Sequence, residues 1–241
     1  MSIVPICGIL SGMEQTQKRW RIAAWVLLPI AAAIILLQSV NVLFLGLFNL
    51  RALLVCVLSV GIPTALGTAC LVKSLSGSEQ RKKAVRTVLW VLFSFYIISL
   101  VGTLFLSRIN FYSFREDRLV YLAHFEEMTN FMPFETVLRY IRAFRRGIIV
   151  ETSLLNLVGN LILMMPMAFF LPSLFCQMRK FWKFLLLMLA LLLSIEALQL
   201  LLCCGSCDVD DVILNLFGTL VAYGIWHIPW VKRVHTCLYI F

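Results

Sequence analysis

The sequence predicts an all-α, polytopic transmembrane helical bundle of about six spans, with an extracytoplasmic loop that carries an interfacial helix. Three observations predict this fold class. Hydrophobic residues make up 61% of the 241 positions and charged residues only 14%, whereas a soluble domain has roughly 45–50% apolar and about 25% charged residues. Apolar runs recur along the chain, each near the length of about 20 residues that crosses a bilayer. Basic residues occur in short clusters between these runs.

The apolar runs follow one another through short connections, apart from one long connection after the third. Pro29 and Pro63 lie inside the first two runs, and proline is tolerated in membrane helices where neighbours satisfy the freed carbonyl. The expected spans are 22–45, 52–72, 87–106, 152–172, 184–202 and 212–228.

Lysine and arginine mark one side of the predicted bundle. Basic clusters precede the first run, separate the second from the third and the fourth from the fifth, and follow the sixth. Cytoplasmic loops carry the excess of Lys and Arg, so six spans place both termini in the cytoplasm of a multi-pass protein of the plasma membrane. The net charge of +9 is divided among these clusters, which disfavours nucleic acid as a partner and favours membrane lipids.

The long connection, 107–151, carries arginines that its acidic residues nearly balance. Within it, 134–149 alternates basic and apolar residues near helical spacing, which is typical of a helix lying on an anionic membrane surface. A solvated helix packed on the loop fits the pattern equally well. The sequence thus predicts three parts: a three-span scaffold over 1–106, an extracytoplasmic loop with an amphipathic helix over 107–151, and a three-span core over 152–241.

The fifth run contains two polar residues at spacing i, i+3, Glu196 and Gln199, which share one helix face. An ionisable side chain at the centre of a membrane helix costs about 2.5–3.5 kcal/mol on insertion scales. A functional role is therefore expected for Glu196, with the side chain either paired or protonated.

The start of the sixth run holds the densest acidic cluster. Asp208, Asp211, Asn215 and Gly218 fall at i, i+3, i+7 and i+10, which is one continuous helix face. Asp208 also suits a plain capping role at the helix start. With Asp210 included, three carboxylates lie within four residues. This exceeds what one cap needs, and a metal or a cationic substrate would relieve their repulsion.

A third polar face lies in the fourth run, where Asn156, Gly159 and Asn160 sit at i, i+3 and i+4. Such residues often serve only close packing and hydrogen bonding between membrane helices. The predicted topology nevertheless places them at the same depth as Glu196 and Asp211. Convergence of polar faces from three helices favours a functional site.

Cysteines cluster at Cys203, Cys204 and Cys207. A disulfide is feasible on an oxidising side of the membrane. A zinc site needs four good ligands, and His124 is the only histidine expected on that side, so no metal site is predicted. The sequence has no GxSxG, P-loop, GxGxxG or HExxH motif, and it leaves open both the cofactor and the question of catalysis.

Four motifs between about 130 and 224 resemble the VanZ-like family. They occur in the order Asn130-x-x-Pro133-Phe134, then Leu155-Asn156-Leu157-Val158-Gly159-Asn160 followed by Pro166, then Glu196-x-x-Gln199, and then Asp208-Val209-Asp210-Asp211-Val212-Ile213-Leu214-Asn215-Leu216-Phe217-Gly218. One departure is Gly205, where the family often has an arginine, so no role of that arginine is expected here.

The resemblance implies a membrane protein of the cell envelope of a Gram-positive bacterium, in a family named for resistance to the glycopeptide teicoplanin. It implies no mechanism. The leading hypothesis is a protein that lowers susceptibility to glycopeptide and lipoglycopeptide antibiotics, by binding the drug or a lipid-linked envelope component at the outer leaflet. The expected binding residues are Asn130, Pro133, Asn156, Asn160, Glu196, Gln199, Asp208, Asp211 and Asn215.

Two other classes of function remain open. A membrane enzyme would use paired carboxylates as general acid and base on a lipid-linked substrate, with Glu196, Asp208 and Asp211 as catalytic candidates. A transporter or flippase would use Glu196 as a proton-linked group. The leucine-rich stretch 185–193 disfavours the transporter, because the polar face does not continue toward the cytoplasm.

Overall fold

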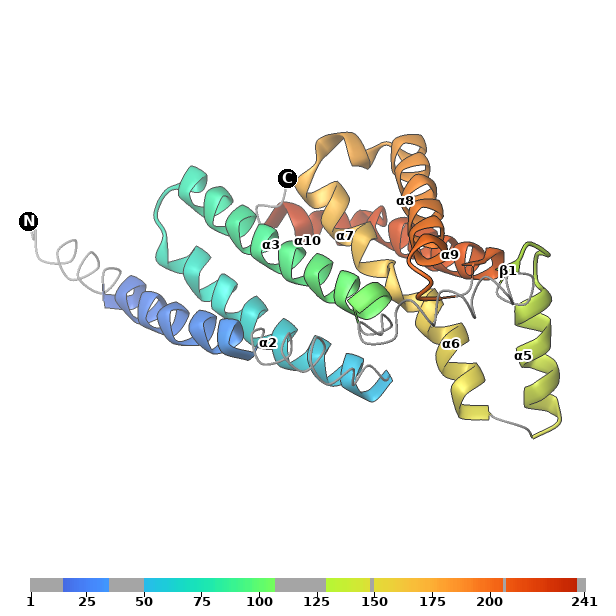
Figure 1. Ribbon diagram of the computed structural model, residues 1–241. Helices are drawn as coiled ribbons and strands as arrows, with labels where there is room; N and C mark the ends of the chain where they lie inside the picture. The colour runs from blue at the N-terminus through green and yellow to red at the C-terminus, as the bar shows by residue number, and fades with distance from the viewer. Residues whose placement is uncertain (1–14, 35–49, 107–128, 148–149, 206, 238–241) are drawn as a thin grey trace, which may run out of the picture. The chain divides into compact units, whose positions relative to one another are not determined.

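The computed structural model describes residues 15–34, 50–106, 129–147, 150–205 and 207–237 (Figure 1). These residues are predominantly helical, which confirms the predicted all-α class. Within them, four helical stretches are long and apolar enough to cross a membrane. They are Ser78–Phe105, Leu157–Leu174, Phe181–Leu201 and Val209–Trp226.

The chain forms two compact units, one of residues 1–99 and 235–241 and the other of residues 100–234. The first contains the helix 15–34, α2 (Leu50–Ser74) and most of α3 (Ser78–Val101). These helices overlap the first three predicted runs, although the first and third begin several residues earlier, and part of the first run, 35–45, lies outside the described residues.

The helix 15–34 runs antiparallel to α2. Gly67 of α2 lies against Leu28, and the Lys73 ammonium sits 4.5 Å from the ring centroid of Trp20. Contacts between late residues of one helix and early residues of the other require opposite directions. This pairing is what a sequence of consecutive membrane-crossing segments predicts.

The second unit is built around α9 (Val209–Trp226), which packs against α6 (Val150–Leu163), α7 (Met165–Leu174) and α8 (Phe181–Leu201) (Figure 1). The π-helix η1 (Gly102–Leu106) extends α3, α5 (Glu135–Arg145) precedes α6, and the 3-10 helix η2 (Cys176–Arg179) joins α7 to α8. The last helix is α10 (Pro229–Cys237).

The predicted fourth span, 152–172, overlaps the candidate membrane span Leu157–Leu174, but a turn interrupts its helix. It is divided into α6 and α7 at Met164, with a proline in the first turn of α7. Pro166 has no N–H to donate to α6, and its ring clashes with the preceding helical carbonyl, so it ends one helix and suits the first turn of the next.

Glycine allows α9 to approach α6 at the middle of the unit. A Cβ atom built on Gly218 would lie 1.8 Å from the backbone oxygen of Leu161. Small residues permit such contact between membrane helices, whose association depends on close packing. At the other end of α9, the ring of Tyr223 stacks on Phe184 of α8 at 4.2 Å, and its hydroxyl donates to the Met178 carbonyl at 3.2 Å.

A short parallel bridge adds strand structure that the sequence analysis did not predict. β1 (Thr129–Asn130) pairs with β2 (Cys207–Asp208), with Asn130 opposite Asp208. The bridge holds the segment before α5 beside the start of α9, although the two are distant in sequence.

Candidate functional site

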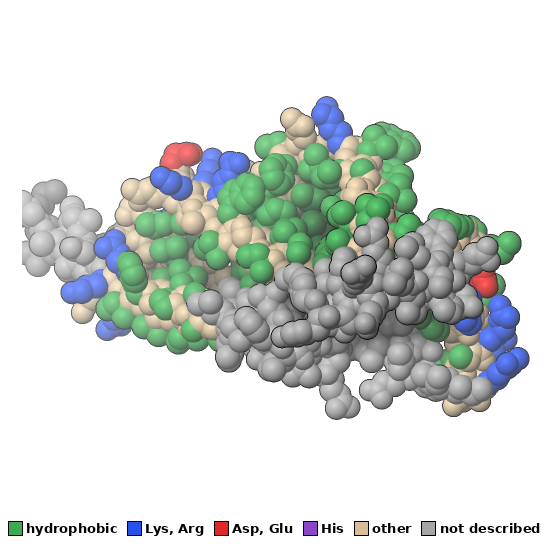
Figure 2. Space-filling view, viewed as in Figure 1, with side chains coloured by type: hydrophobic (Ala, Val, Ile, Leu, Met, Phe, Trp, Pro, Cys, Tyr) green, Lys and Arg blue, Asp and Glu red, His purple; other side chains and the backbone are tan. Residues whose placement is uncertain are grey.

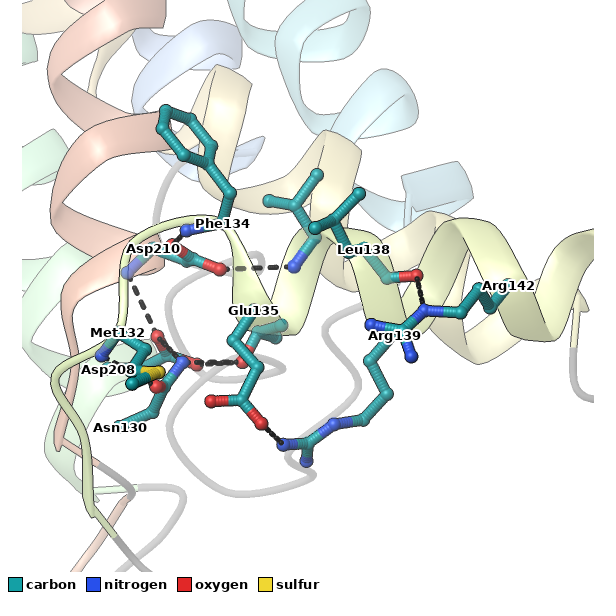
Figure 3. Close-up of polar contacts among 11 residues, drawn as sticks. Asn130, Met132, Phe134, Glu135, Leu138, Arg139, Arg142, Asp208 and Asp210 are labelled. Carbon is teal, nitrogen blue, oxygen red and sulfur yellow. Dashed lines mark hydrogen bonds and ion pairs between the residues drawn. The ribbon is translucent and has the colours of Figure 1, made fainter.

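Asp208 is the N-cap of α9 and the centre of a network of hydrogen bonds (Figure 3). Its Oδ1 accepts from the Asp210 N–H at 2.9 Å and from the Asn130 amide at 3.0 Å. Its Oδ2 accepts from the Thr136 hydroxyl at 2.6 Å. The buried carboxylate thus caps its own helix and also binds the segment that leads into α5.

Asp210 caps a different helix, α5. Its Oδ1 accepts from the Phe134 N–H at 2.5 Å and its Oδ2 from the Val137 N–H at 3.1 Å, as the dashed lines in Figure 3 show. Phe134 is itself the N-cap residue of α5, in the left-handed region at φ 66°, and its apolar side chain provides no acceptor. A carboxylate from α9 therefore satisfies two free amides and the positive dipole end of α5.

These bonds explain two of the three clustered carboxylates without a ligand. Thr136 and Asp210 belong to the network but were absent from the predicted site. The sequence does contain a sign that α5 needs an outside acceptor. This helix begins after Pro133-Phe134, with no Ser, Thr, Asp or Asn at its N-cap. A helix start of this kind needs an acceptor from elsewhere in the chain.

A second polar group lies between α6 and α9. The Asn160 amide donates to the Asp211 carboxylate, and the Asn215 amide donates to the Asp211 carbonyl at 2.8 Å. Asn215 is 6% exposed, and its side-chain oxygen has no hydrogen-bond partner among the described residues. Asp211 and Asn215 share a helix face with Gly218, which lies against α6.

The two polar residues of α8 have different partners. Glu196 is buried and accepts from the Asp208 N–H at 3.2 Å, so it joins the network at the start of α9. Gln199 is also buried, and it donates to the Leu104 carbonyl of η1 at 3.3 Å. Pro133 is exposed in the loop before α5, and Asn156 is in α6, with its side chain outside the described residues.

The structure thus places six of the nine predicted residues in two groups. One group is the network that holds α5 against α9, and it contains Asn130, Asp208 and Glu196. The other lies between α6 and α9, and it contains Asn160, Asp211 and Asn215. Within the described part of the chain, no three His, Cys, Asp or Glu side chains form a group suited to a metal ion. The group between α6 and α9 presents a carboxylate and an amide oxygen, which are acceptors for N–H, O–H or ammonium groups.

Cys207 lies in the turn between α8 and α9, and the pKa of its thiol depends on the nearby carboxylates. Burial raises the pKa of Cys207, and the nearby charges of Glu196 and Asp208 raise it further. The thiolate is the reactive form, so a raised pKa makes alkylation slower at a given pH. We expect Glu196→Gln to lower the pKa and to speed alkylation of Cys207 by N-ethylmaleimide near pH 8, measured by peptide mass spectrometry.

The exposed Cys176 serves as an internal reference for reagent concentration in this experiment. The midpoint of the pH–rate profile at Cys207 should move to lower pH in the variant, while the rate at Cys176 stays unchanged. An unchanged midpoint would contradict the placement of Glu196 beside this turn.

Comparison with known proteins agrees with these motifs. Residues 93–231, more than half of the 241, match the family model described as VanZ/LLP1. The match contains α5 to α9 and both polar groups. The chain matches no curated protein and no solved structure. The extent of the family match shows that this helical membrane protein belongs to the VanZ/LLP1 family.

Proposed function

We propose that this protein lowers the susceptibility of a bacterial cell to glycopeptide and lipoglycopeptide antibiotics such as teicoplanin. It does so by binding the drug, or a lipid-linked component of the envelope, at the outer leaflet of the plasma membrane of a Gram-positive bacterium. Family membership supports the link to glycopeptide resistance at the level of the family. The basic clusters support an orientation with both termini in the cytoplasm and the start of α9 outside.

The observation that carries the proposal is the buried side-chain oxygen of Asn215. A buried acceptor that is left without a partner costs about 1–3 kcal/mol. Buried polar groups without a partner, which lower stability, are expected at functional sites, where a ligand can pair with them. Glycopeptides and lipid-linked precursors are rich in N–H and O–H donors, which this oxygen and the neighbouring Asp211 carboxylate accept.

The hydrogen bonds favour binding over paired-carboxylate catalysis. The Asp208 carboxylate already accepts three hydrogen bonds from the chain itself. Of the other two catalytic candidates, Glu196 accepts from the Asp208 N–H, whereas Asp211 accepts from the Asn160 amide. Binding through Asn160, Asp211 and Asn215 needs no carboxylate pair.

The replacement Asn215→Leu separates function from stability. It removes the buried acceptor and keeps the branched shape of the side chain, so thermal stability is expected to stay unchanged or to rise. The protection against teicoplanin is expected to fall to the level of cells without the protein. Both quantities are measured at matched abundance, as the minimal inhibitory concentration and as the unfolding temperature of purified protein.

Thr219→Val is the matched control. Thr219 is fully buried one helical turn after Asn215, and its hydroxyl donates to the Asn215 carbonyl within α9. The control should keep its protection. Full protection in Asn215→Leu cells, at normal abundance, would overturn the proposed binding site.

Asp211→Asn tests binding against catalysis in the same cells. We expect envelope lipids and lipid-linked precursors to show the same mass profile with wild-type and variant protein, while the teicoplanin susceptibility differs. A species that changes only with the wild type would identify an enzyme, and its mass would give the reaction.

A further inference from the structure

The loop before α5 and one side of α5 expose large apolar side chains. Phe131 and Met132 are 69% and 70% exposed, and Phe134 is exposed beside them. Leu138 and Ile141 continue this surface along the helix, and it ends at Phe144. Exposed apolar side chains in such a contiguous group mark a surface that meets a membrane or a partner.

Arginines line the same helix beside this apolar surface. The stretch 135–146 contains four arginines and one acidic residue, Glu135. Arg139 contacts Glu135 at 3.2 Å, and both side chains are exposed. Arg142, Arg145 and Arg146 are exposed as well. Figure 2 shows the basic side chains gathered over α5, with apolar side chains next to them.

The remaining side of α5 packs on the protein. Thr136, Val137, Tyr140 and Ala143 are partly buried, and α5 contacts α6 and α9. At 100° per residue, Ile141 and Leu138 fall between this packed side and Arg142. Arg145 falls between Ile141 and Leu138, and Phe144 falls beside Val137 at the edge of the packed side. The exposed side of α5 therefore mixes apolar and basic side chains.

Asp208 and Asp210 hold this surface in place. They bind the loop and the first turn of α5 through Asn130, Thr136 and the amides of Phe134 and Val137. The left-handed backbone at Phe134 is costly for a bulky residue. The acidic cluster thus maintains a loop conformation that exposes Phe131, Met132 and Phe134 rather than burying them.

We propose that α5 and the loop 131–134 form an interfacial surface that binds anionic phospholipid headgroups. The apolar side chains enter the boundary between headgroups and acyl chains, and Arg142, Arg145 and Arg146 contact the phosphates. Guanidinium groups suit phosphate because they donate two parallel hydrogen bonds. This inference goes beyond the proposed function and does not depend on any effect on antibiotics.

The presence of apolar and basic side chains on one exposed side of α5 favours a bilayer as the occupant. An amphipathic helix at an interface satisfies apolar and basic side chains at the same depth. A soluble anion would pair the arginines but would leave Phe131, Met132, Ile141 and Phe144 in water. Charge complementarity further favours anionic over zwitterionic lipid.

Photo-crosslinking tests this proposal on the full chain. Benzoylphenylalanine replaces Phe144, and the protein is reconstituted into nanodiscs containing equal amounts of phosphatidylglycerol and phosphatidylcholine. After irradiation, mass spectrometry identifies the lipid attached to the α5 peptide. We expect adducts enriched in phosphatidylglycerol about threefold or more over its share of the bilayer, with the enrichment weakened by high salt.

Two comparisons make the outcome decisive. The triple variant Arg142→Gln, Arg145→Gln, Arg146→Gln should reduce the enrichment to the bulk ratio, whereas Lys82→Gln, Lys83→Gln, Arg86→Gln, which removes three exposed charges from α3, should leave it unchanged. Benzoylphenylalanine in place of Phe217, which is 60% exposed on α9, reports general access to lipid. Lipid adducts from position 217 but none from position 144 would overturn the proposal, as would adducts from position 144 without enrichment.

Discussion

Gly218→Ala is expected to separate α9 from α6 and to destabilise the second unit strongly. The added methyl group would lie 1.8 Å from the Leu161 backbone oxygen, far inside the contact distance. A backbone atom cannot rotate out of the way as a side chain does, so one helix must shift along its length. Overpacking in a core costs typically about 1–3 kcal/mol and occasionally more; for a backbone collision we expect the upper end or beyond.

Gly159→Ala is the matched control, because a Cβ atom at Gly159 meets nothing within 4 Å. Both glycines lie in polar motifs of the family match, and both substitutions add one methyl group. Size-exclusion chromatography and thermal unfolding of detergent-solubilised protein measure the outcome. Equal stability of the two variants would contradict the close contact of α9 with α6.

Asp210→Ala is expected to release the first turn of α5 from α9. Asp210 is 1% exposed and accepts two hydrogen bonds from backbone amides of α5. Hydrogen bonds to a charged group contribute about 1.5–3 kcal/mol each. We therefore expect a stability loss of about 3 kcal/mol or more, with amide hydrogen exchange raised over 134–138.

The replacements Asp210→Asn and Glu135→Ala provide the comparison. Asparagine keeps one side-chain oxygen as an acceptor, so its effect should be intermediate. Glu135 lies on α5 with an exposed carboxylate, and its removal should change stability by less than about 1 kcal/mol. Unchanged exchange over 134–138 in Asp210→Ala would show that the carboxylate does not cap α5.

The capping by Asp210 also connects the two proposals. Asp210 and Asp211 are adjacent in α9, yet one holds the interfacial surface of α5 and the other accepts from Asn160 of α6. Substitutions within α9 can therefore remove the α5 surface and the polar group between α6 and α9 separately. Asp210→Ala should reduce the lipid enrichment at position 144, whereas Asn215→Leu should leave it unchanged.

The helices were predictable because their signals are local. Apolar runs of membrane-crossing length predict α3, α8 and α9, and most of the predicted bounds lie within a few residues of the observed ones. The exception is the start of α3, which lies nine residues before the predicted run because the first turns of this helix are polar. The amphipathic pattern over 134–149 gave α5. Pro166 was visible in the sequence, yet its effect on the fourth span was missed, because proline in a membrane helix kinks or interrupts it depending on its neighbours.

The sequence by itself determined which residues are polar within apolar helices and which helix face they share. The tertiary structure decided which partner each polar group has. Asp208 and Asp210 accept from groups more than 70 residues away, and Asn215 keeps an acceptor that no described residue uses. The physical reason is that a carboxylate or an amide is satisfied by whichever donor the fold brings within about 3 Å, and spacing along one helix does not specify that donor.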